Sequence, residues 1–321
     1  MVRTAVVALI SFSLAMAVAG GVLFGRAVTS PAETPPERSA EAPPSAEPPP
    51  TAERAEKPKE PKPEAWPAEG AAGKAQQIAE SRSGVVSFAA IGPGGRIVGY
   101  ETDRQFYSAS VAKSMLLVAE LRRLRREEAP LDPSTRSLLE QMITISDNDA
   151  ADAIYARVGD PGLNEVAEAS GMTGFAGDVG HWSNVKITAA DMARFMSELD
   201  ELLDLPHGDE GSKLLASVTP AQKWGIPQAT PAGALVRLKG GWRPTDTGQL
   251  VHQAARVDVG NESYSIAVLT DGNPSQEYGQ ETIRLIAAEL LGTSDHAVEL
   301  AKPGRGGHET HRGVTERAGG P

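Results

Sequence analysis

The uneven distribution of proline limits how much of this chain can form a compact fold. Twelve of its 24 prolines fall between Pro31 and Pro67, mixed with Glu, Ala, Ser and Lys. Few side chains there can bury apolar surface, so ordering entropy predicts an extended linker over residues 30–73. A spacer is the favoured interpretation, and a Pro-rich docking ligand is the alternative. With a disordered tail expected at 300–321, the folded body is predicted at 74–299.

An uncharged apolar run, Ala5–Phe24, precedes the linker. As a helix it would span about 30 Å, which is the thickness of a bilayer's hydrocarbon core. This length favours an uncleaved anchor within residues 1–29 that contacts the membrane through residues 5–24. A signal peptide cleaved after Ala17-Val18-Ala19 is the alternative. Either interpretation predicts an extracytoplasmic location for the folded body.

Charge and cysteine content exclude several classes of protein. The chain carries 31 Lys and Arg residues against 42 Asp and Glu residues, a formal net charge of −11. Nucleic-acid-binding domains usually present a clustered basic face, so no nucleic-acid partner is expected. The absence of cysteine excludes disulfides, thiolate metal sites and a cysteine nucleophile.

The order of strand-like and helical segments predicts an α/β (α+β) body. Two strand-like runs joined by Pro93-Gly94-Gly95 read as a hairpin, and three further runs precede a final helix. Between them lie a buried helix and several short helices. This order predicts an antiparallel sheet of about five strands, flanked by helices, with an inserted all-helical subdomain. The strand-like runs are 85–92, 96–103, 234–242, 251–259 and 263–271, and the helical segments are 110–128, 133–205 and 275–291.

Ser110 and Lys113 stand at the start of the predicted buried helix. Residues with this spacing share a helix face, so the amine can reach the hydroxyl. A lysine can activate a serine nucleophile once burial or a nearby cation lowers its pKa. The pattern also occurs by chance about once in a chain of this length. Its second occurrence, Ser183 and Lys186, is interpreted as part of a surface loop.

Two further motifs follow in order. Ser146-Asp147-Asn148 lies between two helical runs, where helix capping is the alternative interpretation. Lys239-Gly240-Gly241 comes at the end of a strand-like run, where a turn is the alternative. The ordered set resembles the penicillin-recognising serine enzymes, and more narrowly the catalytic domain of class A β-lactamases. The resemblance covers about residues 78–291.

The resemblance implies acyl transfer through an acyl-enzyme on Ser110, without metal or cofactor. Lys113 would be the base or proton relay, and Ser146 would pass a proton to the leaving nitrogen. Lys239 would lower the pKa of Lys113 and attract the substrate carboxylate. The implied partner is a small-molecule or peptide substrate, either a β-lactam or a D-alanyl peptide, and a monomer is expected. Implied substrate contacts are Asn148, Gly241, Trp242 and Arg243, with the N–H groups of Ser110 and Trp242 as the oxyanion hole.

The chain departs from that family in the loop that carries its deacylating glutamate. Residues 174–186 contain no glutamate. Asp178 and His181 are the alternative bases there, and both are interpreted as ordinary loop residues. Without a positioned base, deacylation should be slower by roughly 10²–10⁴. The loop therefore predicts an enzyme that binds β-lactams or hydrolyses them weakly.

Gly240 is the second departure, because the family usually has Thr or Ser there. The missing hydroxyl would donate to the substrate carboxylate, a hydrogen bond worth about 1.5–3 kcal/mol. Arg243 could compensate, while Trp242 either narrows the site or packs. Two alternative functions remain: a D-alanyl-D-alanine carboxypeptidase-like cell-wall enzyme, and a catalytically silent module that binds wall fragments or antibiotics.

Overall fold

The computed structural model describes Trp66 and residues 70–294. The predicted anchor at 5–24, most of the linker and the predicted tail at 300–321 lie outside the described residues. Within the described part of the chain, no helix combines the length and apolarity needed to cross a membrane.

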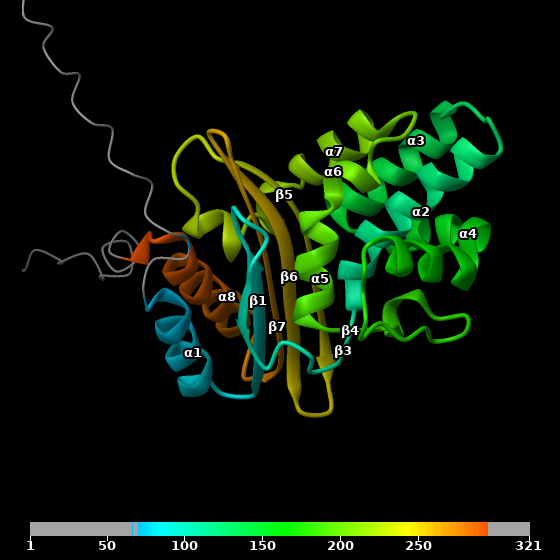
Figure 1. Cartoon of the computed structure of the whole chain (residues 1–321). Coiled ribbons are helices and arrows are strands. Elements are labelled where there is room, and N and C mark those ends of the chain that lie inside the picture. The colour runs from blue at the N-terminus through cyan, green and yellow to red at the C-terminus, as the bar shows by residue number, and fades with distance from the viewer. Residues whose placement is uncertain (1–65, 67–69, 295–321) are drawn as a thin grey trace, which may run out of the picture. The chain divides into compact units, whose positions relative to one another are not determined.

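A five-stranded antiparallel sheet in the order β2-β1-β7-β6-β5 forms the centre of the body (Figure 1). The predicted fold class is confirmed. β1 and β2 pair across Pro93-Gly94-Gly95, as expected for a hairpin, and Gly94 and Gly95 have φ values of 94° and 73°. The strands are β1 (Val85–Ile91), β2 (Ile97–Tyr100), β5 (Leu235–Thr245), β6 (Gly248–Val259) and β7 (Glu262–Asn273), and a separate small sheet pairs β3 (Phe106–Tyr107) with β4 (Lys186–Ile187).

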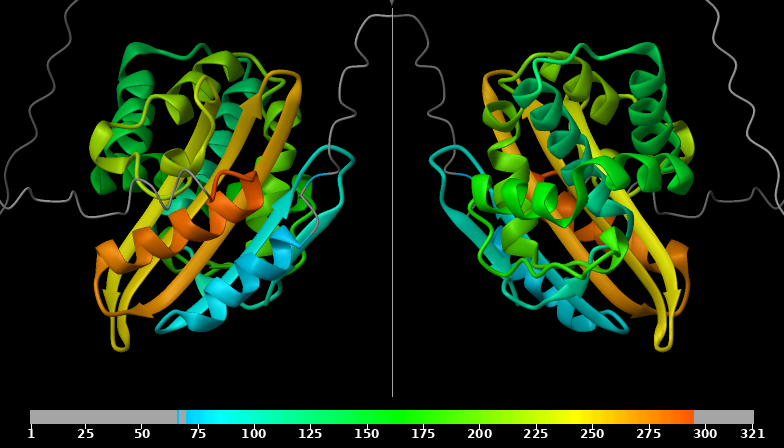
Figure 2. Two further views of the ribbon diagram at one scale, coloured as in Figure 1. Left: turned by 90° about the vertical axis from the view of Figure 1, so that its left-hand side faces the viewer. Right: turned by 90° about the vertical axis from the view of Figure 1, so that its right-hand side faces the viewer.

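Helices cover both faces of the large sheet (Figures 1 and 2). α1 (Ala71–Ser81) and α8 (Gln276–Leu291) pack on one face, and α5 (Ala189–Ser197) packs on the other. Side chains alternate along a strand, so β1 contributes Phe88 and Ala90 to the core under α1 and α8. Ala89 and Ile91 of the same strand belong to the core on the other face.

The start of the folded body needs a correction. α1 begins at Ala71, inside the segment assigned to the linker, and sequence reasoning did not predict this helix. Its buried residues are three alanines spaced four apart, Ala71, Ala75 and Ala79. Alanine also occurs throughout the Pro-rich segment, so this stripe gives a weak hydrophobic signal. Contact with α8 on the sheet is what orders the helix.

The remaining helices form a group beside the sheet (Figure 1). α2 is buried from Ala112 to Leu121, as its apolar sequence predicts. The expectation of several short helices over 133–205 agrees with α4, in which two helical stretches meet at a break at Gly159 (φ 58°) that is followed by Pro161. This group contains α2 (Ala112–Arg126), α3 (Pro133–Glu140), α4 (Asn148–Ala169), α6 (Leu199–Leu202) and α7 (Gly208–Ala216).

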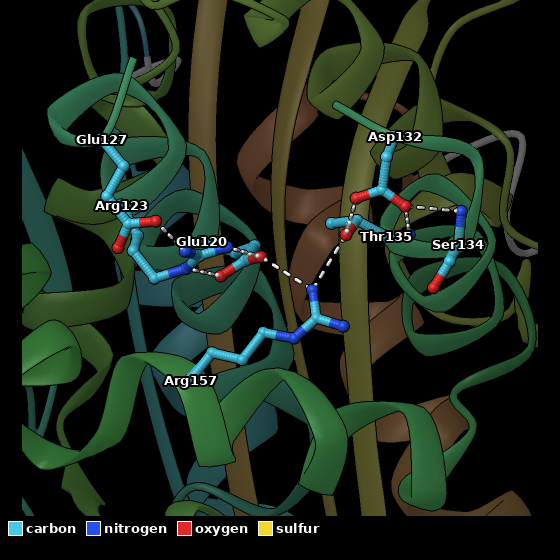
Figure 3. Close-up of polar contacts among 7 residues, drawn as sticks. All are labelled: Glu120, Arg123, Glu127, Asp132, Ser134, Thr135 and Arg157. Carbon is cyan, nitrogen blue, oxygen red and sulfur yellow. Dashed lines mark hydrogen bonds and ion pairs between the residues drawn. The ribbon is translucent and has the colours of Figure 1, made fainter. Parts of the chain in front are cut away.

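A buried charge network joins α2, α3 and α4 (Figure 3). The fully buried Glu120 carboxylate accepts from Arg123 Nε at 2.7 Å and from Arg157 Nη1 at 3.1 Å. Arg157 Nη1 also donates to Thr135 Oγ1 at 2.9 Å, and that hydroxyl donates to Asp132. Two arginines compensate the buried carboxylate. The network therefore fixes α2 against α4, the helices that position Lys113 and Asn148.

Candidate active site

Ser110 lies in a 3-10 turn, η1 (Ala109–Val111), directly before α2. The turn is strained at Ala109, a non-glycine residue with φ 45°. A Cβ atom on Gly241 of β5 would lie 2.9 Å from the backbone nitrogens of both Ser110 and Val111. Only glycine therefore lets β5 approach the turn this closely.

Lys113 lies in the first turn of α2 with its side chain fully buried. Its Nζ donates to the Ser146 carbonyl oxygen at 2.6 Å, to Ser146 Oγ at 3.2 Å and to Asn148 Oδ1 at 2.7 Å. These acceptors match the three donors of an ammonium group. No hydrogen bond joins Lys113 to Ser110 in the part of the chain that the structure describes. The pairing that the spacing permits is thus not made in this conformation.

An irregular turn brings Ser146 to Lys113. α3 continues into a single π-helical turn, η2 (Gln141–Ile145), and Ser146 ends it in the left-handed region, with φ 62° and ψ 37°. This conformation costs a non-glycine residue about 1–2 kcal/mol, and such strain is concentrated at functional sites. Asp147 then caps α4 by accepting from the Ala150 N–H. The motif therefore caps a helix and also places a hydroxyl in the site.

Lys239 of β5 approaches the same hydroxyl. Its fully buried Nζ donates to Ser146 Oγ at 3.0 Å, to Gln222 Oε1 at 3.3 Å and to the Gly240 carbonyl oxygen at 3.0 Å. Because Ser146 Oγ accepts from both lysines, its own hydrogen is free to be donated. The strand-like run expected over 234–242 extends to Thr245, so the alternative of a turn at this motif is wrong. The glycines mark close packing within the strand.

Burial controls the pKa values of both lysines. It is the main cause that lowers the pKa of Lys113 to about 8, against the attraction of Asp147 and Asp152. Burial and the charge of Lys113 hold the pKa of Lys239 well below its usual range. The two ammonium groups therefore disfavour each other's charged form, as expected for neighbouring cations. Lys113 has two carboxylates near it, whereas the hydrogen-bond acceptors of Lys239 are all neutral.

Ser110 opens into a pocket of about 580 Å³. The pocket is lined by a face of α4, by the loop before β4, and by Trp242 and Arg243 of β5. Arg243 Nη1 donates to Asn184 Oδ1 at 2.8 Å, and its guanidinium lies 5.0 Å from the centre of the Tyr107 ring. The expected contacts Asn148, Trp242 and Arg243 thus surround one cavity with Ser110. Gly241 is not among its lining residues.

The loop between α4 and β4 places an aromatic ring over Lys113. Trp182, in the 3-10 turn η3 (Trp182–Asn184), is buried, and its ring centre lies 5.0 Å from Lys113 Nζ. The indole Nε1 donates to Asp152 Oδ1 at 2.6 Å. The two alternative bases of this loop are solvated, with side-chain exposures of 64 % for His181 and 47 % for Asp178. Their interpretation as ordinary loop residues agrees with this exposure, although His181 also lines the pocket.

Trp224 explains why residue 240 is glycine. A Cβ atom there would lie 2.9 Å from Trp224 Cζ2. The Trp224 ring packs edge-on against Trp242, with centres 6.1 Å apart. A threonine at position 240 would therefore displace this pair. Trp242 was expected either to pack or to narrow the site. It packs on Trp224, and it also lines the pocket.

Sequence reasoning missed several residues of this site. Asp152 and Tyr155 line the pocket from α4. Their spacing from Asn148 is helical, so counting turns from the motif could have found them. Gln222 and Trp224 carry no such signal, because they come from a short irregular segment that meets β5 only in the folded chain.

Comparison with known proteins identifies the fold. A β-lactamase from Chitinophaga pinensis DSM 2588 aligns with a TM-score of 0.62 at 17 % identity, over 70 % of this chain and 99 % of that one. A class A β-lactamase from Mycobacterium abscessus aligns at 0.60 and 22 %, over 69 % and 98 %. PBP-A aligns at 0.60 and 20 %, over 73 % and 99 %. The fold is that of the penicillin-recognising serine enzymes.

The sequence identifies the family. A sequence model described as the β-lactamase enzyme family matches residues 124–293, more than half of the chain. No curated protein sequence matches. The chain belongs to the β-lactamase enzyme family, as the ordered motifs predicted. The match begins after Ser110 and Lys113, so the roles of these two residues rest on the motif and the geometry.

Proposed function

We propose that this chain is a serine hydrolase that forms a long-lived acyl-enzyme on Ser110 with β-lactams. The observation that carries the proposal is the position of Ser146 Oγ, 3.2 Å from Lys113 Nζ and 3.0 Å from Lys239 Nζ. Two buried lysine side chains around one hydroxyl are costly to maintain for packing alone. A proton-relay function beside the Ser110 nucleophile would explain why these side chains are buried together.

In the proposed reaction, Ser110 Oγ attacks the carbonyl carbon of an amide, ester or lactam. The neutral amine of Lys113 takes the serine proton as the new C–O bond forms. The electron pair moves to the carbonyl oxygen, toward the N–H groups of Ser110 and Trp242. Ser146 then protonates the leaving nitrogen or oxygen as its bond to carbon breaks, and Lys113 returns the proton to Ser146. The products are the Ser110 ester and a neutral Lys113.

Hydrolysis of this ester should be slow. It needs a positioned base to activate water, and losing one costs roughly 10²–10⁴ in rate. Residues 174–186 contain no glutamate, and Trp182 covers Lys113 from this loop. The proposal is therefore a penicillin-binding protein rather than an efficient β-lactamase.

Intact mass of the full chain after incubation with benzylpenicillin tests the proposal. A persistent adduct is expected, absent in Ser110→Ala and retained in Ser183→Ala, which alters the second Ser-x-x-Lys sequence. Absence of an adduct with the drug unchanged would contradict acylation. An unmodified protein with the drug consumed would contradict slow hydrolysis.

A catalytically silent binding module is the second candidate. It is favoured by the three donors of Lys113, all of which are used without Ser110. Turnover of a chromogenic cephalosporin that disappears in Ser110→Ala would exclude it. Release of D-alanine from a D-alanyl-D-alanine peptide would instead identify a carboxypeptidase-like enzyme.

We also propose that the body acts outside the cytoplasm, held at the membrane by residues 5–24. The uncharged apolar run supports this location. N-terminal sequencing of the protein from its membrane fraction should recover the apolar run. A mature N-terminus near Gly20 would contradict the anchor and leave a secreted protein.

A further inference from the structure

The pocket extends along α4 beyond the proposed catalytic residues. Asn148, Asp152, Tyr155 and Ala156 line it and share one helix face. Eight residues along a helix correspond to about 12 Å. Gly180 and Ser183, two small residues of the loop before β4, also line the pocket. The pocket can therefore hold a side chain that projects from an acyl group on Ser110.

Asp152 gives this extension its charge. It is the only carboxylate among the described residues that line the pocket. Its Oδ1 accepts from the neutral indole of Trp182, and its Oδ2 has no hydrogen bond in the described chain. Lys113 interacts with this charge electrostatically, but its three donors are used by Ser146 and Asn148. Asp152 therefore has an oxygen available for a cationic ligand.

The surroundings of Tyr155 are also negative. Its hydroxyl donates to Asp160, whose other oxygen accepts from the Gly180 N–H at 3.4 Å. Burial and then the Asp160 carboxylate raise the pKa of Tyr155 to about 12, with a further contribution from Asp178. An anionic group bound at this end of the pocket would be repelled by the Asp160 and Asp178 carboxylates.

Two basic side chains also line the pocket, and each has a contact of its own with residues outside α4. Arg243 donates to Asn184 Oδ1 and stacks over Tyr107. The His181 ring contacts the Val179 carbonyl oxygen at 3.0 Å, and its side chain is 64 % exposed. The α4 side is therefore where the pocket would distinguish a cation from an anion.

We propose that Asp152 binds a primary ammonium group carried on the acyl side of the substrate. The substrate class is an amide, ester or lactam whose acyl chain bears an amine within reach of α4. This inference rests on the proposed acylation of Ser110 and deepens it, since it assigns the pocket a charge preference.

Three penicillins that differ at one carbon of the acyl chain test the preference. Benzylpenicillin carries hydrogen there, ampicillin an ammonium and carbenicillin a carboxylate. The second-order acylation rate of the full chain, followed by intact mass, should fall in the order ampicillin, benzylpenicillin, carbenicillin. Ampicillin should react about fivefold faster than benzylpenicillin, as expected for one partly exposed ion pair.

The Asp152→Asn variant keeps an acceptor for Trp182 and removes the charge. It should bring the ampicillin-to-benzylpenicillin ratio close to one. The ratio isolates the subsite, because any effect of Asp152 on Lys113 changes all three rates alike. Asp149→Asn is the matched control, since Asp149 is an exposed carboxylate on the same helix that does not line the pocket.

Equal rates for the three penicillins, or fastest reaction with carbenicillin, would overturn the inference and leave the proposed acylation intact. If none of them acylates Ser110, the proposed function fails, and equilibrium binding of ampicillin and benzylpenicillin decides the inference. Tighter binding of ampicillin that is lost in Asp152→Asn would uphold the ammonium subsite in a silent module. Equal binding would overturn it.

Discussion

Lys113 and Lys239 share the hydroxyl of Ser146, although each ammonium group would be better solvated in water. The two lysines differ in their surroundings, because Asp147 and Asp152 act on Lys113 while Lys239 is enclosed by neutral groups. Burial lowers the pKa of Lys113 to about 8. A fraction of it is neutral near pH 7, which is the state that a base for Ser110 requires.

The pKa of Lys113 predicts how acylation depends on pH. Only the neutral amine accepts the Ser110 proton, so the rate should rise with pH and level off above about 8. Stopped-flow acylation between pH 6 and 10 measures this profile. Lys113→Met should abolish the reaction. A rate that stays constant across this range would contradict the assignment of Lys113 as the base.

Gly240→Thr, which introduces the usual family residue, should destabilise the protein. The new Cβ would lie 2.9 Å from Trp224, and overpacking of this kind costs about 1–3 kcal/mol. Urea unfolding measures the loss. Gly73→Ala is the control, since a Cβ there meets nothing within 4 Å. Equal stability of Gly240→Thr and wild type would show that Trp224 does not exclude a larger residue.

At the scale of elements, the position of the site depends on how α2 and α4 are held together. The motif residues lie at the N-terminal ends of these helices, whereas the Glu120 network joins them further along (Figure 3). The sequence indicates each helix through its apolar pattern. It does not indicate that Arg157 of α4 reaches Glu120 of α2, because that contact crosses between helices.

The Glu120→Gln substitution should therefore lower the free energy of unfolding substantially. Removing the charge leaves Arg123 and Arg157 without their shared buried carboxylate, and breaking a buried pair costs about 3–5 kcal/mol. Glu165→Gln is the control, because Glu165 is 39 % exposed and pairs with Arg122 and Arg126 at the surface. Such pairs are worth at most about 1 kcal/mol. Similar losses in both variants, measured by denaturant unfolding, would refute the distinction.

At the scale of the whole molecule, His252 links the two sheets. This fully buried residue of β6 accepts from the Thr270 N–H at Nδ1, so its Nε2 carries the hydrogen and donates to the Tyr107 carbonyl oxygen of β3. Burial lowers the pKa of His252 from 6.5 to about 4. The contact between the two sheets therefore requires the neutral imidazole, because a protonated Nδ1 could not accept from Thr270.

This link predicts sensitivity to acid. The pKa of His252 is lower in the folded protein than in the unfolded chain. Its contribution to stability is therefore fully present above about pH 6.5 and is lost as the pH drops toward 4. The loss reaches about 3 kcal/mol at the lower end of this range. Urea unfolding at pH 7, 5.5 and 4.5 measures it. The dependence should persist in His181→Gln, whose residue is exposed, and an NMR titration showing His252 protonated at pH 6 would contradict it.

The sequence by itself determined the order of strands and helices, the buried helix after Ser110 and the residues of the three motifs. These follow from local patterns: alternation, apolar runs and fixed spacings. The structure alone decided that β5 continues past Trp242 to Thr245, that the folded body begins with α1 at Ala71, and that Trp182, Trp224 and Asp152 complete the site. The physical reason is that each of these depends on a partner distant along the chain. A close backbone approach, a stripe of alanines or a shared hydrogen bond is visible only once both partners are in place.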